Sequence, residues 1–353
     1  MKYTINFLPA RYGDCIWIEY GEDNSLNHIL IDGGTGGTKA HIKELLEALP
    51  SGERIIELLV VTHIDRDHIE GILSLLEEND LPCVIKSVWF NGWPHLLENK
   101  SVEFFGAVQG ERLTAAILKH KLPWNTHFEG NAVVVPEEGE LPRLILDGGM
   151  EIILLSPMFE NLAKLRDAWE DEVKKAGLDP GYGAQVHNVV DGDVQSFGVP
   201  EIPDVENLAQ EEFKEDSAPA NGSSIAFIAK YNGTAVLLTG DSHPGVISRS
   251  LNRLGEQIPF KLVKLSHHGS KGNTSPELME QFDCNRFVIS TNGSIYHHPD
   301  AVNMARLLTI KKNPEIIFNY TSEHNKIWKL PILQEKYGYT TIYPDDMGIV
   351  ISL

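Results

Sequence analysis

The sequence has few cysteines and no long apolar run. Both features exclude certain classes of protein. Its three cysteines, Cys15, Cys83 and Cys284, lie far apart and form no C-x-x-C pair. This argues against a disulfide scaffold or a thiolate zinc site and favours a reducing compartment. The first residues lack the apolar core of a signal peptide, and no run approaches the roughly 20 apolar residues of a membrane span. We therefore expect a cytoplasmic protein with no membrane partner.

Basic residues are also scarce. Lysine and arginine number 30 against 50 acidic residues, which gives a formal net charge of −20. Duplex nucleic acid is held largely through phosphate neutralisation by a basic surface. The composition therefore argues against long duplex nucleic acid as a partner. A small anionic substrate, attracted by cations bound at a site, is the partner that we expect, and the oligomeric state is not predicted.

One short segment carries four potential metal ligands. His63, Asp65, Asp67 and His68 directly follow the apolar run 58–61, which reads as a buried strand. A turn between a strand and a helix can direct such side chains to two cations about 3.5–4 Å apart. The alternative is a solvated acidic turn in which Asp67 caps the following helix. Clusters of histidine and carboxylate favour the metal site.

The hydrophobic pattern predicts two strand-and-helix halves around an irregular middle. The predicted strands are 2–8, 14–20, 27–32, 55–61, 83–90, 131–135, 143–147, 150–155, 225–231, 234–239, 260–265, 286–290, 315–319, 339–342 and 348–352. The predicted helices are 39–48, 69–78, 109–120, 160–175, 244–254, 275–281 and 300–308.

The middle of the chain, residues 158–217, differs in composition from its surroundings. A charged helix is followed by a stretch without a clear period and then by an acidic run over 201–216. Long irregular segments inside compact domains are usually functional loops or disordered. We interpret 158–217 as an insertion or lid within a single domain spanning 1–353; a solvated linker is the alternative.

Further polar side chains follow other predicted strands. Asp32, Asp241, the pair His267 and His268, and His298 all lie at or beyond strand ends. Each alone has an ordinary explanation, such as a helix cap, a surface residue or a turn. Together with the four-ligand segment, they predict one site built from loops at one edge of the sheets.

In this order along the chain, the motifs resemble those of the metallo-β-lactamase superfamily, and most of all the hydrolase domain of ComEC-type DNA-uptake proteins and its stand-alone relatives. The matching motifs are Gly13-Asp14, Ile31-Asp32-Gly33-Gly34, Thr62-His63-x-Asp65-x-Asp67-His68 with Gly71, Asn221-x-x-Ser224, Leu238-Thr239-Gly240-Asp241, Leu265-Ser266-His267-His268-Gly269-Ser270 and Tyr296-His297-His298-Pro299. The resemblance implies an α/β fold, the four-layer αββα sandwich, with a dinuclear metal site and an irregular acidic insertion.

The resemblance also implies a ligand set for two divalent ions. It assigns His63 and Asp65 to one ion, Asp67, His68 and His268 to the other, and Asp241 to both. The superfamily's commonest pattern has histidine in place of Asp65 and a further histidine from the middle region, for which His127 and His187 are candidates. A carboxylate hardens the site, so Mn²⁺ or Mg²⁺ become plausible beside Zn²⁺.

Roles outside direct ligation follow from the same resemblance. Asp32 would accept a hydrogen bond from a ligand imidazole. Asp67, His267 and His298 form the catalytic set, with His267 contacting the substrate oxyanion and His298 donating a proton to the leaving group. Whether His267 or His268 is the metal ligand is left open. Lys271 could pair with a phosphate, although an ordinary exposed lysine is the simpler interpretation.

The implied activity is hydrolysis by a dinuclear site with a bridging hydroxide. We favour a phosphodiesterase acting on small nucleotide-like molecules or single-stranded nucleic acid. Hydrolysis of a carboxylic ester, thioester or lactam in the same site is the alternative. A non-catalytic scaffold that retains the fold is the third hypothesis, and the complete set of ligand residues weighs against it.

Overall fold

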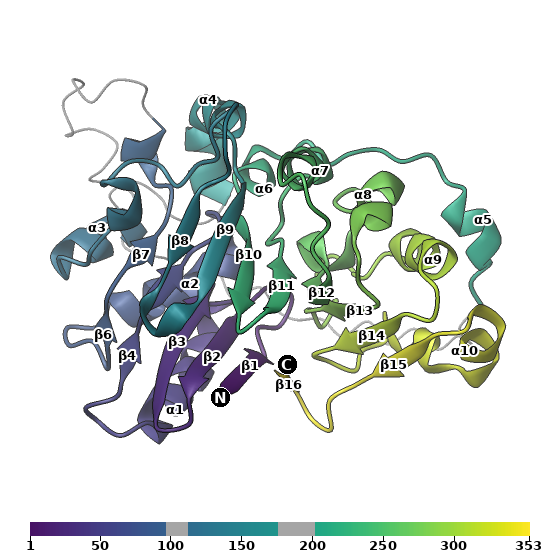
Figure 1. Cartoon of the computed structure of the whole chain (residues 1–353), viewed down its shortest axis with the longest axis horizontal. Helices are drawn as coiled ribbons and strands as arrows, with labels where there is room; N and C mark the ends of the chain where they lie inside the picture. The colour runs from purple at the N-terminus through teal and green to yellow at the C-terminus, as the bar shows by residue number, and fades with distance from the viewer. Residues whose placement is uncertain (97–111, 176–201) are drawn as a thin grey trace.

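Two mixed β-sheets form the centre of the computed structural model, which describes residues 1–96, 112–175 and 202–353 (Figure 1). One sheet has the order β16 (Ile349–Ser352), β1 (Lys2–Phe7), β2 (Ile16–Glu22), β3 (Ser25–Ile31), β5 (Leu58–Val60) and β7 (Val88–Trp89). The other has the order β15 (Thr340–Ile342), β14 (Glu315–Phe318), β13 (Arg286–Ile289), β12 (Phe260–Lys264), β11 (Thr234–Leu238), β10 (Ala226–Tyr231), β9 (Glu151–Ser156) and β8 (Arg143–Ile145). Two short strands, β4 (Ile55–Ile56) and β6 (Val84–Ile85), pair separately.

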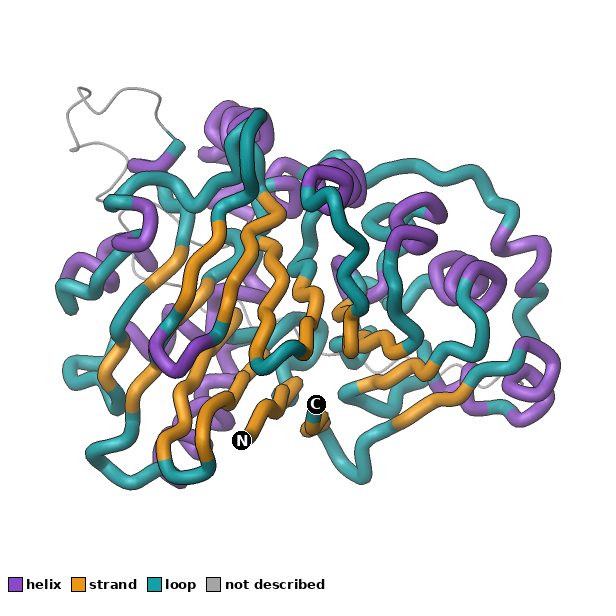
Figure 2. The backbone as a smooth tube through the Cα atoms, in the orientation of Figure 1, coloured by secondary structure: helices purple, strands orange, loops and turns teal. Residues whose placement is uncertain are grey.

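Helices cover the outer faces of both sheets (Figures 1 and 2). They are α1 (Lys39–Ala48), α2 (Arg66–Leu76), α3 (Arg112–Lys119), α4 (Phe159–Lys175), α5 (Val205–Ala209), α6 (Pro219–Gly222), α7 (Pro244–Arg253), α8 (Pro276–Gln281), α9 (Ala301–Ile310) and α10 (Pro331–Tyr337).

The alternation of strand side chains separates two cores. Ile5 and Ile18 of the first sheet belong to a large buried cluster that also holds residues of the second sheet, such as Phe227. The opposite face, with Trp17 and Leu59, packs in a second cluster with residues of α1 and α2. Successive strand residues point to opposite faces, so one strand can serve both cores. The predicted αββα layering is confirmed.

Two predicted strands of the first half are each divided in two. The predicted strand 55–61 becomes β4 and β5, and the predicted strand 83–90 becomes β6 and β7. Both break at the same level, where the Glu57 carboxylate and the Lys86 ammonium pair at 2.8 Å. The first pieces pair with each other, whereas the second pieces join the six-stranded sheet.

The predicted strand at 131–135 is wrong. Asn91 satisfies the backbone there instead, since its side-chain amide donates to the Val133 carbonyl at 2.8 Å and its side-chain oxygen accepts from the Val133 N–H at 2.9 Å. Buried backbone groups need partners, and a side chain can replace a neighbouring strand. The predicted helix 109–120 is present as α3 from Arg112, and positions 109–111 lie outside the described residues.

Parts of the segment 158–217 are described. Residues 158–175 include α4. Farther along, α5 contacts α9. The Arg306 guanidinium of α9 lies 5.3 Å from the ring centroid of Phe213, which follows α5. The stretch 176–201 lies outside the described residues, so the insertion or lid stays a prediction. Among the described residues, no helix combines the length and apolarity needed to cross a membrane.

Candidate metal centre

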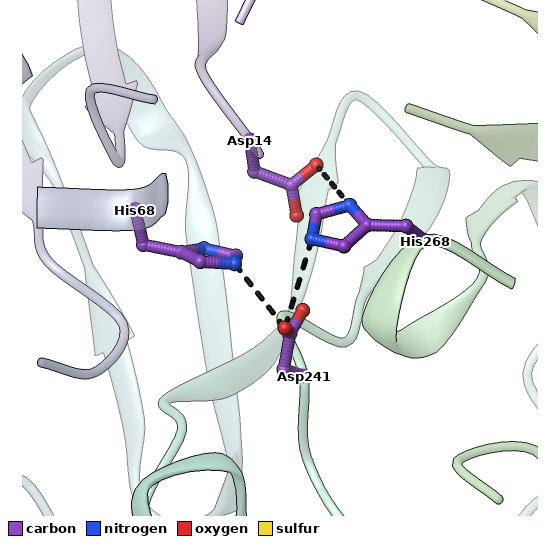
Figure 3. Close-up of side chains that lie close together, drawn as sticks. All are labelled: Asp14, His68, Asp241 and His268. Carbon is purple, nitrogen blue, oxygen red and sulfur yellow. Dashed lines mark ion pairs between the residues drawn. The ribbon is translucent and has the colours of Figure 1, made fainter. Parts of the chain in front are cut away.

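Loops from both sheets meet at one place. His63 follows β5, Asp241 follows β11, and His268 follows β12. The loop after β5 is joined to the residue before β10, because the Ile225 N–H donates to the Thr62 carbonyl at 2.9 Å, and the loops after β11 and β12 are joined because the His267 N–H donates to the Gly240 carbonyl at 3.1 Å. Figure 3 shows side chains from distant parts of the chain pointing toward one another at this junction. The residues that follow these strands therefore lie close together, as the sequence predicted.

One carboxylate oxygen is the focus of the cluster. Oδ2 of Asp241 lies 3.2 Å from Nε2 of His68 and 3.7 Å from Nε2 of His268 (Figure 3). It also lies 3.9 Å from Nε2 of His63. Ligands held at about 2.1 Å around a tetrahedral ion lie roughly 3.4 Å from one another. Asp241 therefore stands where a carboxylate shared by two ions would stand.

Three buried nitrogens in the cluster have no hydrogen-bond partner. They are Nε2 of His63, His68 and His268. Buried polar atoms are almost always hydrogen-bonded, so three orphaned lone-pair sites around one carboxylate need an explanation. Imidazole nitrogen and carboxylate oxygen are both ordinary ligands of Zn²⁺ and Mn²⁺. The residues present therefore fit a site for divalent ions.

The other nitrogen of each imidazole is fixed by a hydrogen bond. Nδ1–H of His68 donates to Oδ2 of Asp32 at 2.8 Å, and Nδ1 of His268 lies 2.7 Å from the Ser290 carbonyl, which can only accept. Nδ1 of His63 lies 3.0 Å from the Thr62 hydroxyl, which itself donates to Asp32 at 2.8 Å. This pattern leaves Nε2 of each imidazole free to coordinate a metal ion, as is usual for histidine ligands.

Two further carboxylates of the motif face the imidazoles. Oδ2 of Asp65 lies 3.5 Å from Nε2 of His63, and Oδ2 of Asp67 lies 3.5 Å from Nε2 of His268. Helix α2 begins at Arg66, so Asp65 takes the N-cap position, but its side chain makes no capping hydrogen bond. The alternative in which Asp67 caps the helix is wrong, because Asp67 lies inside the first turn.

Glycines allow the loops to approach this closely. A Cβ on Gly13 would lie 1.7 Å from the Asp67 carbonyl oxygen, and one on Gly71 would lie 2.0 Å from the Gly33 carbonyl oxygen. Only glycine fits such contacts without moving the backbone. Side chains at these positions would push α2 away from both loops.

The structure distinguishes the two neighbouring histidines. His268 is fully buried with Nε2 among the carboxylates, whereas the His267 side chain is 21% exposed. Nδ1 of His267 lies 3.0 Å from Oδ1 of Asn273, whose amide nitrogen donates to the Asp241 carbonyl at 3.1 Å. Nε2 of His267 lies 3.9 Å from Oδ2 of Asp241. His268 thus faces the interior of the cluster and His267 its open side, and the assignment of His268 as a ligand stays a prediction.

Backbone strain accompanies this arrangement. Asp32, His267 and His268 have φ values of 57°, 47° and 54°. Non-glycine residues in this left-handed region are uncommon, and they cluster at functional sites where the surrounding structure holds them. The turn after β12 therefore directs two adjacent imidazoles differently.

The electrostatics of the cluster favour charged groups despite burial. Burial opposes ionisation of Asp67, but the imidazoles of His68 and His268 outweigh it and hold the pKa at about 2. Burial likewise opposes protonation of His68, yet Asp241, Asp32 and Asp67 together raise its pKa well above the ordinary value. The pKa of His268 is raised as well, because Asp241 and Asp14 outweigh burial.

Metal binding at about pH 6 is therefore expected to release about two protons, since both raised-pKa imidazoles are charged in the stripped protein and must lose their protons to bind. Titration calorimetry with Mn²⁺ in buffers of different ionisation enthalpy measures the number. His268→Ala should lower it by about one, while His41→Ala on the exposed face of α1 leaves it unchanged. Binding without proton release would contradict the assignment.

Of two further residues in the cluster, Asp14 was named only as part of a motif, without a role, and Lys264 was missed by sequence reasoning. Asp14 and Lys264 form a fully buried ion pair, and Nζ of Lys264 also donates to the Gly240 carbonyl at 3.1 Å and lies 3.7 Å from Oδ1 of Asp241. Asp14 is within 4.8 Å of the ligand atoms of His68, Asp241 and His268. Because Lys264 neutralises it, we place Asp14 behind the ligands. A lysine inside a predicted strand was the available signal.

His298 lies beside His267, with ring centroids 5.2 Å apart. Burial, reinforced by His267 and His268, lowers its pKa to about 3. The ring is therefore uncharged at neutral pH, and its N–H can donate a hydrogen bond. The proton-donor role stays a prediction.

The middle region contributes no further histidine among the described residues of the cluster. His127 accepts a hydrogen bond from the indole of Trp89 at 3.0 Å and lies in the short 3₁₀ turn Thr126–Phe128. His187 lies outside the described residues. Lys271 is exposed, and its backbone N–H donates to Asp300 at 2.8 Å.

Comparison with known proteins agrees with this geometry. The model of the metallo-beta-lactamase superfamily matches residues 8–293. The chain belongs to this superfamily. The curated relative ComE operon protein 3 of Bacillus subtilis (strain 168) is 25% identical over 211 residues, which cover 57% of the chain and 23% of the relative. The metallo-β-lactamase chain described here thus spans about a quarter of that protein.

The solved structures to which the chain is similar are distant. CmlA, a diiron β-hydroxylase from Streptomyces venezuelae, is 12% identical with a TM-score of 0.43, covering 100% of this chain and 54% of that chain. A metallo-β-lactamase mutant from Cronobacter sakazakii is 12% identical with a TM-score of 0.31, covering 73% of this chain and 71% of that one.

Proposed function

We propose that the protein is a metal-dependent hydrolase of phosphodiesters, with small nucleotide-like molecules or single-stranded nucleic acid as substrates. The observation that carries this proposal is the set of three orphaned imidazole nitrogens around the Asp241 carboxylate. His63, Asp65 and Asp241 would hold one divalent ion. Asp67, His68 and His268, with Asp241 shared, would hold the other.

Zn²⁺ and Mn²⁺ are the proposed occupants. Carboxylates supply three of the six proposed ligands, and such oxygen-rich sets suit hard ions better than thiolate sites do. When bound, two such ions supply Lewis acidity and a readily ionised water at neutral pH.

The chain's own residues would orient the substrate and stabilise its charge. Nδ1 of His267 is held by Asn273, whose amide nitrogen also donates to Asp216 at 3.0 Å. As an imidazolium, His267 would keep this contact and donate Nε2–H, at the open side of the cluster, to a phosphoryl oxygen that gains negative charge. The uncharged ring of His298 beside it would donate a hydrogen bond to the leaving oxygen.

A phosphodiester agrees best with the composition and the relative. A small anion is compatible with a site whose neighbouring surface carries histidines, while the net charge of −20 opposes binding of long duplexes. The similarity to ComE operon protein 3 supports the resemblance to ComEC-type hydrolase domains from which the phosphodiester assignment is taken.

Turnover of model substrates tests the proposal. Stripped protein reloaded with Mn²⁺ or Zn²⁺ should hydrolyse bis-p-nitrophenyl phosphate in preference to p-nitrophenyl acetate. His68→Ala should lose this activity, because it removes a ligand, and His41→Ala should keep it. Preference for the acetate would favour an ester hydrolase instead. No activity toward either substrate, with no metal retained, would favour a non-catalytic scaffold protein.

A further inference from the structure

An exposed aromatic side chain lies at the open side of the candidate centre. Tyr296, in the loop between β13 and α9, is 54% exposed. Its ring stacks on His298, with centroids 6.1 Å apart and planes 26° apart. Tyr12, in the loop between β1 and β2, meets it edge-on at 6.3 Å. The two loops are tied together, because the Asn292 N–H donates to the Arg11 carbonyl at 2.7 Å.

This aromatic pair borders the centre directly. The ring of Tyr296 is 6.4 Å from that of His267, whose Nε2 is 3.9 Å from Oδ2 of Asp241. Burial, together with the charges of Asp67 and Asp65, raises the pKa of Tyr296 to about 12. The phenol stays protonated, so it presents an uncharged, polarisable face beside a site that takes anions.

The exposure of Tyr296 is unusual within the described part of the chain. Among its large exposed hydrophobic residues, only Tyr296 and Phe159 are aromatic, and Phe159 begins α4 away from the cluster. A single exposed apolar residue is ordinary, but this exposed ring also stacks on His298, which lies beside His267 at the candidate centre.

We propose that Tyr296 and Tyr12 form a subsite that stacks a planar ring, such as a nucleobase, carried by a phosphate ester whose phosphate lies at the metal centre. The ring of the ligand would continue the stack that His298 and Tyr296 already form. Stacking tolerates any base, because every base has a π-face. This inference rests on the proposed phosphodiesterase function and narrows its substrates to esters that bear an aromatic ring.

Binding of two matched ligands tests the subsite without turnover. AMP and ribose 5-phosphate share the sugar and phosphate and differ by the base. Calorimetry with the Mn²⁺-loaded protein should show AMP binding on the order of tenfold more tightly. Tyr296→Leu should abolish this preference and leave ribose 5-phosphate binding unchanged, whereas Tyr296→Phe should retain it. Phe159→Leu is the matched control and should change neither ligand.

The outcomes separate the subsite from the proposed function. Equal binding of the two ligands by the unaltered protein, or an AMP preference that survives in Tyr296→Leu, would overturn the subsite even if bis-p-nitrophenyl phosphate is hydrolysed. Preference lost in Tyr296→Phe would assign the effect to the hydroxyl and also overturn stacking. Binding of neither ligand would overturn the subsite, and the turnover assay then decides the phosphodiesterase proposal separately.

Discussion

Replacing Asp241 by asparagine is expected to reduce turnover by on the order of a thousandfold, equivalent to losing about 4 kcal/mol of transition-state stabilisation. Nε2 atoms of His63, His68 and His268 all lie within 3.9 Å of Oδ2 of this carboxylate. An amide has nearly the same shape but no negative charge, so both proposed ions lose their shared ligand. Elemental analysis of the purified variant should show fewer than two ions bound.

The matched control is Asp346→Asn, an exposed carboxylate in the turn before β16. It should retain metal and turnover, because it lies outside the cluster. If Asp241→Asn kept both ions and near-normal turnover, the proposed bridging role would be wrong.

Replacing Lys264 by methionine is expected to give the largest loss of stability. Lys264 is fully buried, and its removal leaves the buried Asp14 carboxylate without its cation. Breaking a buried pair from one side destabilises proteins by about 3–5 kcal/mol. Urea unfolding of the metal-free protein measures the change. Lys326→Met, which removes an exposed partner of Glu323, should change the free energy of unfolding by no more than about 0.5 kcal/mol.

The double variant Asp14→Asn with Lys264→Met separates folding from metal binding. Removing both charges should restore much of the lost stability, because no unpaired charge is buried. Metal affinity should still fall by about 10–100-fold, the usual effect of losing groups that orient ligands. The reason is that the Asp241 carboxylate would lose the Lys264 ammonium, whose Nζ lies 3.7 Å from Oδ1. Unchanged affinity would show that Lys264 serves folding alone.

Local sequence predicted much of the centre. The four-ligand segment His63 to His68 occupies one turn, so its geometry follows from a strand ending and a helix beginning. The same holds for Asp241 and His268, which follow strands of the second sheet. Asp32 was predicted as an acceptor for a ligand N–H, and its carboxylate does accept from His68 at 2.8 Å.

The features that the sequence did not predict depend on contacts between residues far apart in the chain. Lys264 is one of two lysines in β12, and its partner Asp14 lies 250 positions earlier in the chain. The backbone of Val133 pairs with a side chain, Asn91, which no periodicity reveals. The choice between His267 and His268 depended on two successive left-handed residues, whose conformation their identities do not require.

The ligand set has a consequence for the protein as a polymer. Its imidazoles include His68, in the first turn of α2, and His268, in the turn after β12 of the second sheet, 200 positions apart. Two bound metal ions would thus form a reversible cross-link between the two halves of the chain. Such a long-range cross-link restricts the unfolded ensemble. Removing the metal with a chelator would weaken the contact between the two halves before it altered either half. The metal content of a preparation would therefore determine its free energy of unfolding.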